Sequence, residues 1–164
     1  MSAFEKIAEK ICSRDEMARR CAQWQAEGLR VVFTNGCFDI LHYGHLSYLA
    51  AARDLGDRLV VGLNSAASVR RLKGPARPIH DELSRTHLLA GFAFVDGVVL
   101  FEEDTPYALI EALQPDVLTK GGDWLPEQIV GADLVLARGG RVCALPYVAG
   151  FSTTQIEQKI RGKS

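Results

Sequence analysis

The sequence predicts a three-layer α/β/α domain built on a five-stranded parallel sheet. From residue 30 onward, short runs rich in β-branched residues alternate with stretches of helical periodicity. That alternation is typical of a parallel sheet with helices on both faces. The chain has 164 residues, the length of a single domain, and neither a linker nor a repeat interrupts it. The predicted strands are residues 30–34, 58–63, 97–101, 116–119 and 141–145.

Residues 1–29 are predicted to be a helical flank preceding one compact domain at residues 30–164. Ile7 and Ile11 share one helical face, and Met17, Cys21 and Trp24 share the next. Ser13 lies between the two sets and is a suitable N-cap for the second helix. The flank is therefore expected to hold two short helices.

Four further helices are predicted from apolar periodicity and from residues that typically begin or end a helix. The first is residues 45–55, with Leu46, Leu49 and Ala50 facing the core and Gly56 at its end. The second is residues 81–94, with Asp81 as N-cap and Leu83, Leu88 and Leu89 facing the core. Thr105 is the expected N-cap of a helix that starts at Pro106, and the hydroxyls of residues 152–154 open an amphipathic closing helix.

Charge and cysteine usage narrow the functional classes. The formal net charge is −1, with 19 basic and 20 acidic residues, which gives no reason to expect nucleic acid or an anionic membrane as partner. The four cysteines form no CxxC pair, so neither a zinc site nor a disulfide framework is predicted. No apolar run has membrane-spanning length, and the N-terminus lacks a signal-peptide core. We expect a cytoplasmic protein that acts on a small molecule.

Polar and glycine-rich segments follow four of the predicted strands. The carboxyl ends of parallel strands lie at one edge of the sheet, where Rossmann-like folds bind ligands at the topological switch point. Backbone amides freed by glycine and the hydroxyls at a helix start suit phosphate groups. We therefore expect one cleft formed by residues 34–36, 64–65, 120–123 and 150–154.

The segment GCFDILHYGH, residues 36–45, is the strongest local signal. His42 and His45 flank Gly44 at the start of a helix, where phosphate oxygens bind well. The two histidines could instead form a metal pair or a helix cap, but no third ligand recurs nearby. Cys37 has no partner base in the sequence, so a nucleophilic role is not expected.

The other motifs have ordinary structural readings as well. The basic run Arg70, Arg71, Lys73 and Arg77 suits a solvated helix end as well as a phosphate clamp. Residues 152–154 could be a plain N-cap, and residues 120–123 a turn. Phe38 and Trp124 could be packing residues or border a base.

Taken in order, the segments GCFDILHYGH, VGLNS, RRLKGPARPI, VLTKGGDW and GFSTTQI resemble the cytidylyltransferase-like family of nucleotidyltransferases, whose hallmark is an HxGH loop. Within that family, these segments together with FEEDTP are most similar to the stand-alone D-glycero-β-D-manno-heptose 1-phosphate adenylyltransferases. Two departures stand out. Residues 147–150 replace the Arg-Thr-Glu-Gly of glycerol-3-phosphate cytidylyltransferases, and Ala66 replaces an acidic residue of the heptose group.

The resemblance implies transfer of AMP from ATP to heptose 1-phosphate for lipopolysaccharide core synthesis. It also implies Mg²⁺ held mainly by the nucleotide and water, a separate kinase that supplies heptose 1-phosphate, and a homo-oligomer (dimer or tetramer). His42, His45 and Lys73 are the implied catalytic residues, and Asn64 and Arg77 the implied acceptor-binding residues. The implied nucleotide-binding residues are Thr34, Asn35, Gly36, Phe38, Asp39, Gly44, Lys120, Gly121, Gly122, Asp123, Ser152, Thr153 and Thr154.

Three questions stay open from the sequence. Asp39 could act in the reaction or simply tie its loop to backbone amides. The reaction could use CTP and glycerol 3-phosphate rather than ATP and a heptose. The chain could also be a nucleotide-binding module without catalysis, although binding alone would not need the whole set of motifs.

Overall fold

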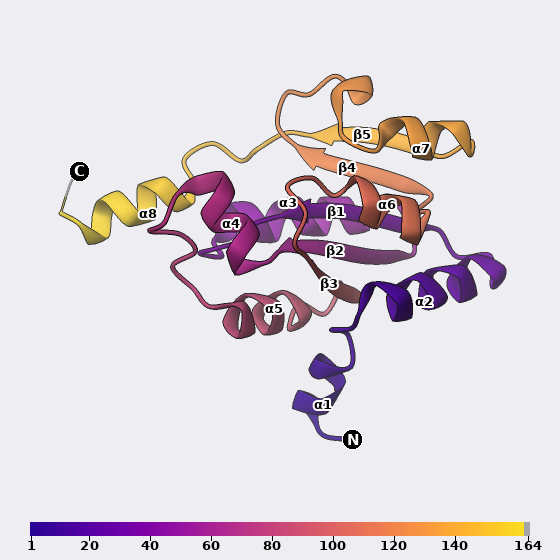
Figure 1. Cartoon of the computed structure of the whole chain (residues 1–164), viewed down its shortest axis with the longest axis horizontal. Helices are drawn as coiled ribbons and strands as arrows, with labels where there is room; N and C mark the ends of the chain where they lie inside the picture. Colours follow the sequence, from indigo (N-terminus) through magenta and orange to yellow (C-terminus); the bar gives the residue numbers. More distant parts are fainter. Residues whose placement is uncertain (163–164) are drawn as a thin grey trace.

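Five parallel strands form one sheet in the order β3–β2–β1–β4–β5 (Figure 1). The computed structural model describes residues 1–162. The predicted α/β class with a five-stranded parallel sheet is confirmed. Strands β1, β2 and β4 run past their predicted ends, because backbone pairing continues into the polar and glycine residues that follow. Their bounds are β1 Val31–Gly36, β2 Arg58–Asn64, β3 Gly97–Phe101, β4 Val117–Gly121 and β5 Arg141–Leu145.

Helices cover both faces of the sheet and make two hydrophobic clusters. One cluster joins Met17, Phe33 and Ile110 beneath α2, α6 and α7, and the other joins Leu49 and Leu89 beneath α3 and α5. Figure 1 shows α2 and α6 in front of the sheet and α3 behind it. The helices are α1 Ala3–Ala8, α2 Arg14–Ala26, α3 Tyr43–Arg53, α4 Ala66–Lys73, α5 Glu82–Ala90, α6 Tyr107–Leu113, α7 Ala132–Ala137 and α8 Thr153–Ile160, with a 3₁₀ turn at Pro126–Gln128.

The N-terminal flank packs into the sheet. Ser13 caps α2 as predicted, since its hydroxyl accepts a hydrogen bond from the Glu16 amide. Met17 and Cys21 are fully buried, and Ile11 makes a parallel bridge with Val98 of β3. The flank therefore covers part of the core, while the domain boundary after residue 29 stays a prediction.

Two helix faces differ from prediction. In α3 the buried residues are Tyr48, Leu49 and Ala52, whereas Leu46 is exposed. The C-cap of α3 is Asp54 rather than Gly56. Gly56 instead lets the loop after α3 lie close to β1, because a Cβ at Gly56 would be only 2.6 Å from Val32 Cγ2.

In α5 only Leu89 of the three leucines predicted to face inward is buried. Leu83 and Leu88 are exposed, and the buried face carries Arg85, Thr86, Leu89 and Ala90. A buried arginine breaks the apolar period, which explains the error. Asp81 does cap the helix, but α5 ends at Ala90 rather than at residue 94.

The start of α6 was also predicted wrongly. The helix begins at Tyr107 with Pro106 as N-cap. No side chain caps it, so the hydroxyl of Thr105 does not act as the predicted cap. Helices α4 and α7 were not predicted as separate elements. Among residues 1–162, none of the helices combines the length and apolar character that crossing a membrane would need.

Candidate active site

The carboxyl ends of the strands open into a cavity of about 650 Å³, within the usual size range of small-molecule sites. The ladder between β1 and β4 pairs only Val32 with Val117 and Phe33 with Leu118. Beyond these pairs the two strands separate, at the point where the strand order reverses. The cavity therefore lies where an open α/β sheet offers a binding crevice.

Most of the sequence-predicted site residues line this one cavity. Residues from β1, α3, α4, β4 and α8 meet there although they lie far apart in the sequence. The predicted residues that line it are Asn35, Gly36, Phe38, Asp39, His42, Gly44, His45, Asn64, Lys73, Lys120, Gly121, Ser152, Thr153 and Thr154.

Four predicted residues lie outside the cavity lining, each for a physical reason. Thr34 is fully buried beneath the floor, and Arg77 is held between Asp39 and Glu157. The Gly122 amide donates to the carbonyl of Leu145, and a Cβ at Gly122 would lie 3.0 Å from the ring of Tyr147, which does line the cavity. The next residue, Asp123, is exposed.

His42 and His45 form a stacked pair at the start of α3. Their ring centroids are 3.9 Å apart and the ring planes differ by 27°. His42 is the N-cap, and its Nδ1 accepts a hydrogen bond of 3.1 Å from the Gly44 amide. In the neutral ring the proton is therefore on Nε2, which is free to donate to a ligand.

Both imidazoles are biased toward the neutral form. Burial, together with the smaller effects of the charges of His42 and Lys73, lowers the pKa of His45 to about 4. Burial also lowers the pKa of His42. Nδ1 of His45 is buried and has no hydrogen-bond partner among the described residues. Near neutral pH the pair can thus offer N–H donors to an anion without carrying full charge.

Gly44 provides the space in which the His42 ring lies. A Cβ at position 44 would come within 2.9 Å of His42 Cε1 and 3.2 Å of Phe151 Cβ. The absence of a side chain therefore leaves space for the His42 ring and for Phe151, which precedes α8. Whether it also leaves room for a nucleotide stays a prediction.

Phe38 adopts a backbone conformation that L residues rarely take. Its φ is 42°, and its ring is buried edge-on against His45 with centroids 5.3 Å apart. A non-glycine residue in the left-handed region costs free energy, so surrounding packing must hold it there. Gly36 makes this possible, because a Cβ there would lie 2.9 Å from the Phe38 ring.

Asp39 ties the loop after α4 to the floor of the cavity. Its carboxylate accepts hydrogen bonds from the amides of Ile79 and His80 and pairs with Arg77 at 3.3 Å. Arg77 also pairs with Glu157 of α8. This network links the β1 loop, the α4–α5 loop and α8, and it gives Asp39 and Arg77 a structural task.

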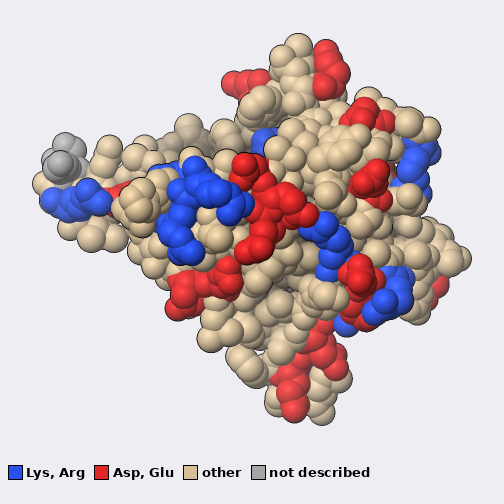
Figure 2. All heavy atoms as spheres, viewed as in Figure 1, with Lys and Arg blue, Asp and Glu red and all other residues tan. Residues whose placement is uncertain are grey.

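Two lysines bring positive charge to the cavity. Lys73 is the last residue of α4 and is exposed, while Lys120 of β4 is half-buried, and burial lowers its pKa. Figure 2 shows the basic side chains over α4 next to acidic ones over the loop between β3 and α6.

Helix α8 presents its N-terminus to the same cavity. Ser152 caps it, with Oγ 3.1 Å from the Gln155 amide, so the plain N-cap reading holds for this residue. Thr153 and Thr154 follow and also line the cavity. A helix start with hydroxyls favours anionic ligands.

Tyr48 and Arg85 shape the site but were not singled out from the sequence. The Tyr48 hydroxyl lies 2.6 Å from Thr34 Oγ1 and 3.0 Å from Thr119 Oγ1, joining β1 to β4 where their ladder has ended. Arg85 is fully buried and donates to the carbonyls of Cys37 and Asn64. For Arg85, the sequence offered one indication: it lies four positions before Leu89 and therefore on the same helix face as that buried residue.

The cavity does not hold a ready-made metal site. Among residues 1–162, no group of three or more His, Cys, Asp and Glu residues could hold a metal ion. The carboxylate of Asp39 is already used by backbone amides and Arg77.

Comparison with known proteins agrees with this geometry. The family profile described as Cytidylyltransferase-like matches residues 33–159, which include the histidine pair, Lys73 and the start of α8. The chain belongs to the cytidylyltransferase-like family. As a member of that family it is a nucleotidyltransferase, and the predicted enzyme class is confirmed.

Curated relatives of this cytidylyltransferase-like chain include two bifunctional proteins HldE. That of Nitrobacter hamburgensis is 54% identical over 100% of this chain and 33% of its own length. That of Trichlorobacter lovleyi is 58% identical over 92% of this chain and 31% of its own length. The chain therefore spans about a third of the relatives that it matches.

Two solved structures have a similar fold. The lipopolysaccharide core biosynthesis protein from Thermoplasma volcanium is 33% identical, with a TM-score of 0.60 over 74% of this chain and 98% of its own. Pantoate-beta-alanine ligase from Francisella tularensis is 15% identical, with a TM-score of 0.57 over 92% of this chain and 76% of its own. The second likeness concerns the fold alone.

Proposed function

We propose that the protein transfers AMP from ATP to D-glycero-β-D-manno-heptose 1-phosphate. A phosphate oxygen of the sugar phosphate attacks the α-phosphorus of ATP, the bond between the α-phosphorus and the bridging oxygen breaks, and pyrophosphate leaves. The products are ADP-heptose and pyrophosphate. A phosphate monoester, with a second pKa of about 6, is already mostly a dianion at neutral pH, so a strong general base is unnecessary.

The main barrier to such a reaction is electrostatic. An anionic nucleophile must approach an anionic phosphorus, and negative charge develops on the leaving pyrophosphate. Catalysis then depends on positioning and on preorganised donors and cations. Bound ATP supplies its own Mg²⁺, which would neutralise part of the phosphate charge.

The observation that carries the proposal is the stacked His42–His45 pair facing a cavity that Lys73 and the α8 N-terminus also line. In this proposal His42 Nε2–H and the imidazole of His45 donate to phosphate oxygens, and Lys73 lies against the α-phosphate. Ser152, Thr153 and Thr154 hold the outer phosphates. Gly121 and Lys120 border the nucleoside.

The choice of acceptor is supported by the relatives. Two neighbours carry the name HldE, and a third is described as a lipopolysaccharide core biosynthesis protein. The absence of Arg-Thr-Glu-Gly before residues 152–154 favours a heptose over glycerol 3-phosphate as acceptor. We further propose a cytoplasmic enzyme, fed by a kinase activity that makes heptose 1-phosphate, and a homo-oligomeric assembly.

The proposal is tested by pyrophosphate release with ATP, CTP, GTP and UTP, each offered with heptose 1-phosphate and with glycerol 3-phosphate. We expect release with ATP and the heptose. Release with CTP and glycerol 3-phosphate alone would replace the proposed substrates. Nucleotide binding without release from any pair would instead indicate a non-catalytic module.

A further inference from the structure

The cavity has a second polar region that the phosphate chemistry above does not use. It consists of Asn64 at the end of β2 and of Asp104 and Thr105 in the loop between β3 and α6, and all three line the cavity. We call these three residues the loop cluster. Asp104 and Thr105 belong to the FEEDTP segment, to which the sequence assigned no role in binding.

The side-chain oxygen of Asn64 is left free by a chain of hydrogen bonds. The Ser68 hydroxyl donates to the carbonyl of Glu103 at 3.2 Å, so its oxygen must accept from Asn64, whose Nδ2 lies 3.0 Å away. The amide orientation is therefore determined, and Oδ1 accepts no hydrogen bond within residues 1–162. Only 4% of Asn64 is exposed, yet it lines the cavity.

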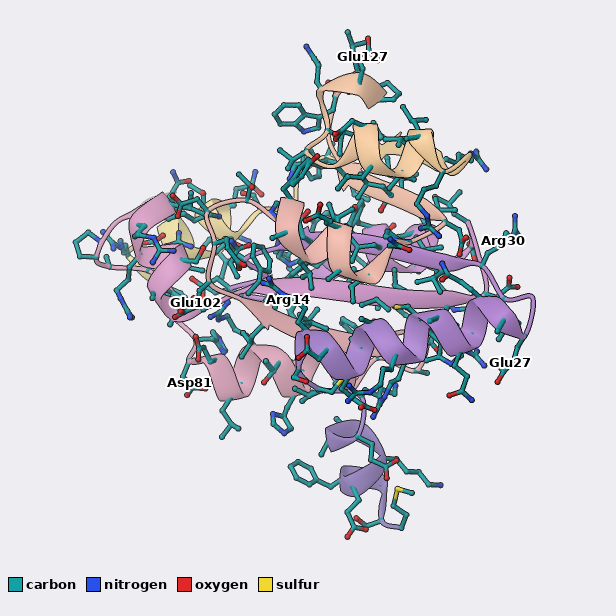
Figure 3. The ribbon with its side chains drawn as sticks, turned by 45° about the vertical axis from the view of Figure 1, so that its right-hand side comes forward. Arg14, Glu27, Arg30, Asp81, Glu102 and Glu127 are labelled. Carbon is teal, nitrogen blue, oxygen red and sulfur yellow. The ribbon has the colours of Figure 1, made fainter. Side chains whose placement is uncertain are left out.

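Asp104 is oriented in a comparable way. Arg71 Nε donates to its Oδ1 at 3.0 Å, while Oδ2 has no partner among the described residues. Arg71 also donates to the carbonyl of Glu102, and Glu103 pairs with Arg14 of α2 at 2.6 Å. Figure 3 labels Glu102 beside α4 and Arg14 at the start of α2, the two helices that brace this loop.

Thr105 completes the cluster. Because α6 starts without a side-chain cap, the hydroxyl of Thr105 is not used in the helix, and it makes no hydrogen bond within residues 1–162. The cluster thus offers one buried acceptor oxygen on Asn64, a second on Asp104, whose side chain is 65% exposed, and one hydroxyl. Because Arg71 pairs with the carboxylate of Asp104, the cluster is rich in acceptors without a strong net charge, and it suits groups that donate hydrogen bonds.

We propose that the loop cluster binds the hydroxyl groups of the acceptor sugar. This inference rests on the proposed function, in which the acceptor is a sugar 1-phosphate. The sugar would lie with its phosphate toward Lys73 and the histidine pair and with its hydroxyls toward Asn64 and Asp104. The polarity of the cavity, cationic on one side and acceptor-rich on the other, orients such a molecule for attack through its phosphate.

The test compares steady-state kinetics of Asp104→Ala with those of Glu103→Ala. Glu103 is the matched control, since it is a neighbouring carboxylate in an ion pair that does not line the cavity. We expect Asp104→Ala to raise KM for heptose 1-phosphate about tenfold or more, the usual effect of losing a hydrogen bond to a charged group. KM for ATP, kcat and the inhibition constant of inorganic phosphate should stay within about twofold. Asp104→Asn, which keeps one oxygen acceptor, should show a smaller rise.

The other outcomes overturn the inference in distinguishable ways. If Asp104→Ala and Glu103→Ala behave alike, or if KM for both substrates rises together, the loop is only structural. If ethanolamine phosphate is a better acceptor than the sugar phosphate, the cluster binds a cation. If the wild-type protein releases no pyrophosphate with any sugar 1-phosphate, the proposed function itself fails. If the wild-type protein is active and Asp104→Ala has unchanged kinetics, only the role of the loop cluster in sugar binding is contradicted.

Discussion

The phenol oxygen of Tyr48 lies 2.6 Å from the hydroxyl oxygen of Thr34, beneath the floor of the cavity. The same oxygen lies 3.0 Å from Thr119 Oγ1 on β4. Since backbone pairing between β1 and β4 ends at Phe33 and Leu118, these hydroxyls hold the two strands together where they begin to separate. Tyr48 therefore positions the switch point at which the cavity opens.

Replacement of Tyr48 by phenylalanine should weaken the fold. Two buried hydroxyls would lose their shared partner, and an unsatisfied buried polar group costs about 1–3 kcal/mol. We expect a loss of that size in the free energy of unfolding, measured by urea denaturation. Tyr43→Phe on the same helix is the control, because Tyr43 is 57% exposed. An equal loss in both variants would contradict the role given to Tyr48.

His45 should stay neutral far below the usual histidine range. Its pKa is about 4 in the folded protein, against about 6.5 in an unfolded chain, so protons favour the unfolded state. Its contribution to stability is complete above about pH 6.5 and is lost as the pH falls toward 4. ¹⁵N NMR of the imidazole, assigned with His45→Gln, measures the midpoint directly. A midpoint near 6.5 would show that the ring is not desolvated.

Loss of the proposed phosphate donors should affect turnover more than binding. Removing one preorganised donor to a developing charge costs on the order of 10²-fold in kcat. We expect His45→Ala to show such a loss and Lys73→Ala to impair mainly the chemical step. Arg70→Ala is the control for Lys73, since Arg70 is exposed on α4 and does not line the cavity. Near-normal kcat in either active-site variant would remove that residue from the proposed mechanism.

Arg77 should act on nucleotide binding through α8. Its side chain is 14% exposed and bridges Asp39 and Glu157, so Arg77→Gln would free the helix that carries Ser152, Thr153 and Thr154. We expect KM for the nucleotide to rise about tenfold, equivalent to ~1.4 kcal/mol, with a smaller change in kcat. Arg161→Gln also breaks a pair with Glu157 but at an exposed position, and it should have little effect. If both variants behave alike, Arg77 does not position the helix.

The sequence predicted correctly those features that depend on residues close together in the chain. The strand ends, the histidine pair and Ser152 could be located because glycine, capping residues and β-branched runs act locally. Tyr48 and Arg85 could not, because their importance depends on partners in other elements: Thr119 lies 71 residues from Tyr48, and Cys37 lies 48 residues from Arg85.

Helix faces were the weakest part of the prediction. Leu83 and Leu88 are exposed, while Arg85 is buried. Its Nη1 donates to two backbone carbonyls, whereas Nε and Nη2 have no hydrogen-bond partner among the described residues. Arg77 illustrates a related difficulty. Its position near a predicted phosphate site suggests ligand binding, and only the structure shows that Asp39 and Glu157 pair with it; acceptor binding by Arg77 stays a prediction.

The central claim is transfer of a nucleotidyl group to a sugar phosphate, and ³¹P NMR of the complete reaction tests it most directly. With ATP, Mg²⁺ and heptose 1-phosphate, we expect the coupled pair of signals of a nucleoside diphosphate sugar together with pyrophosphate. Formation of ADP with orthophosphate, or an unchanged spectrum from a protein that binds ATP, would contradict the claim.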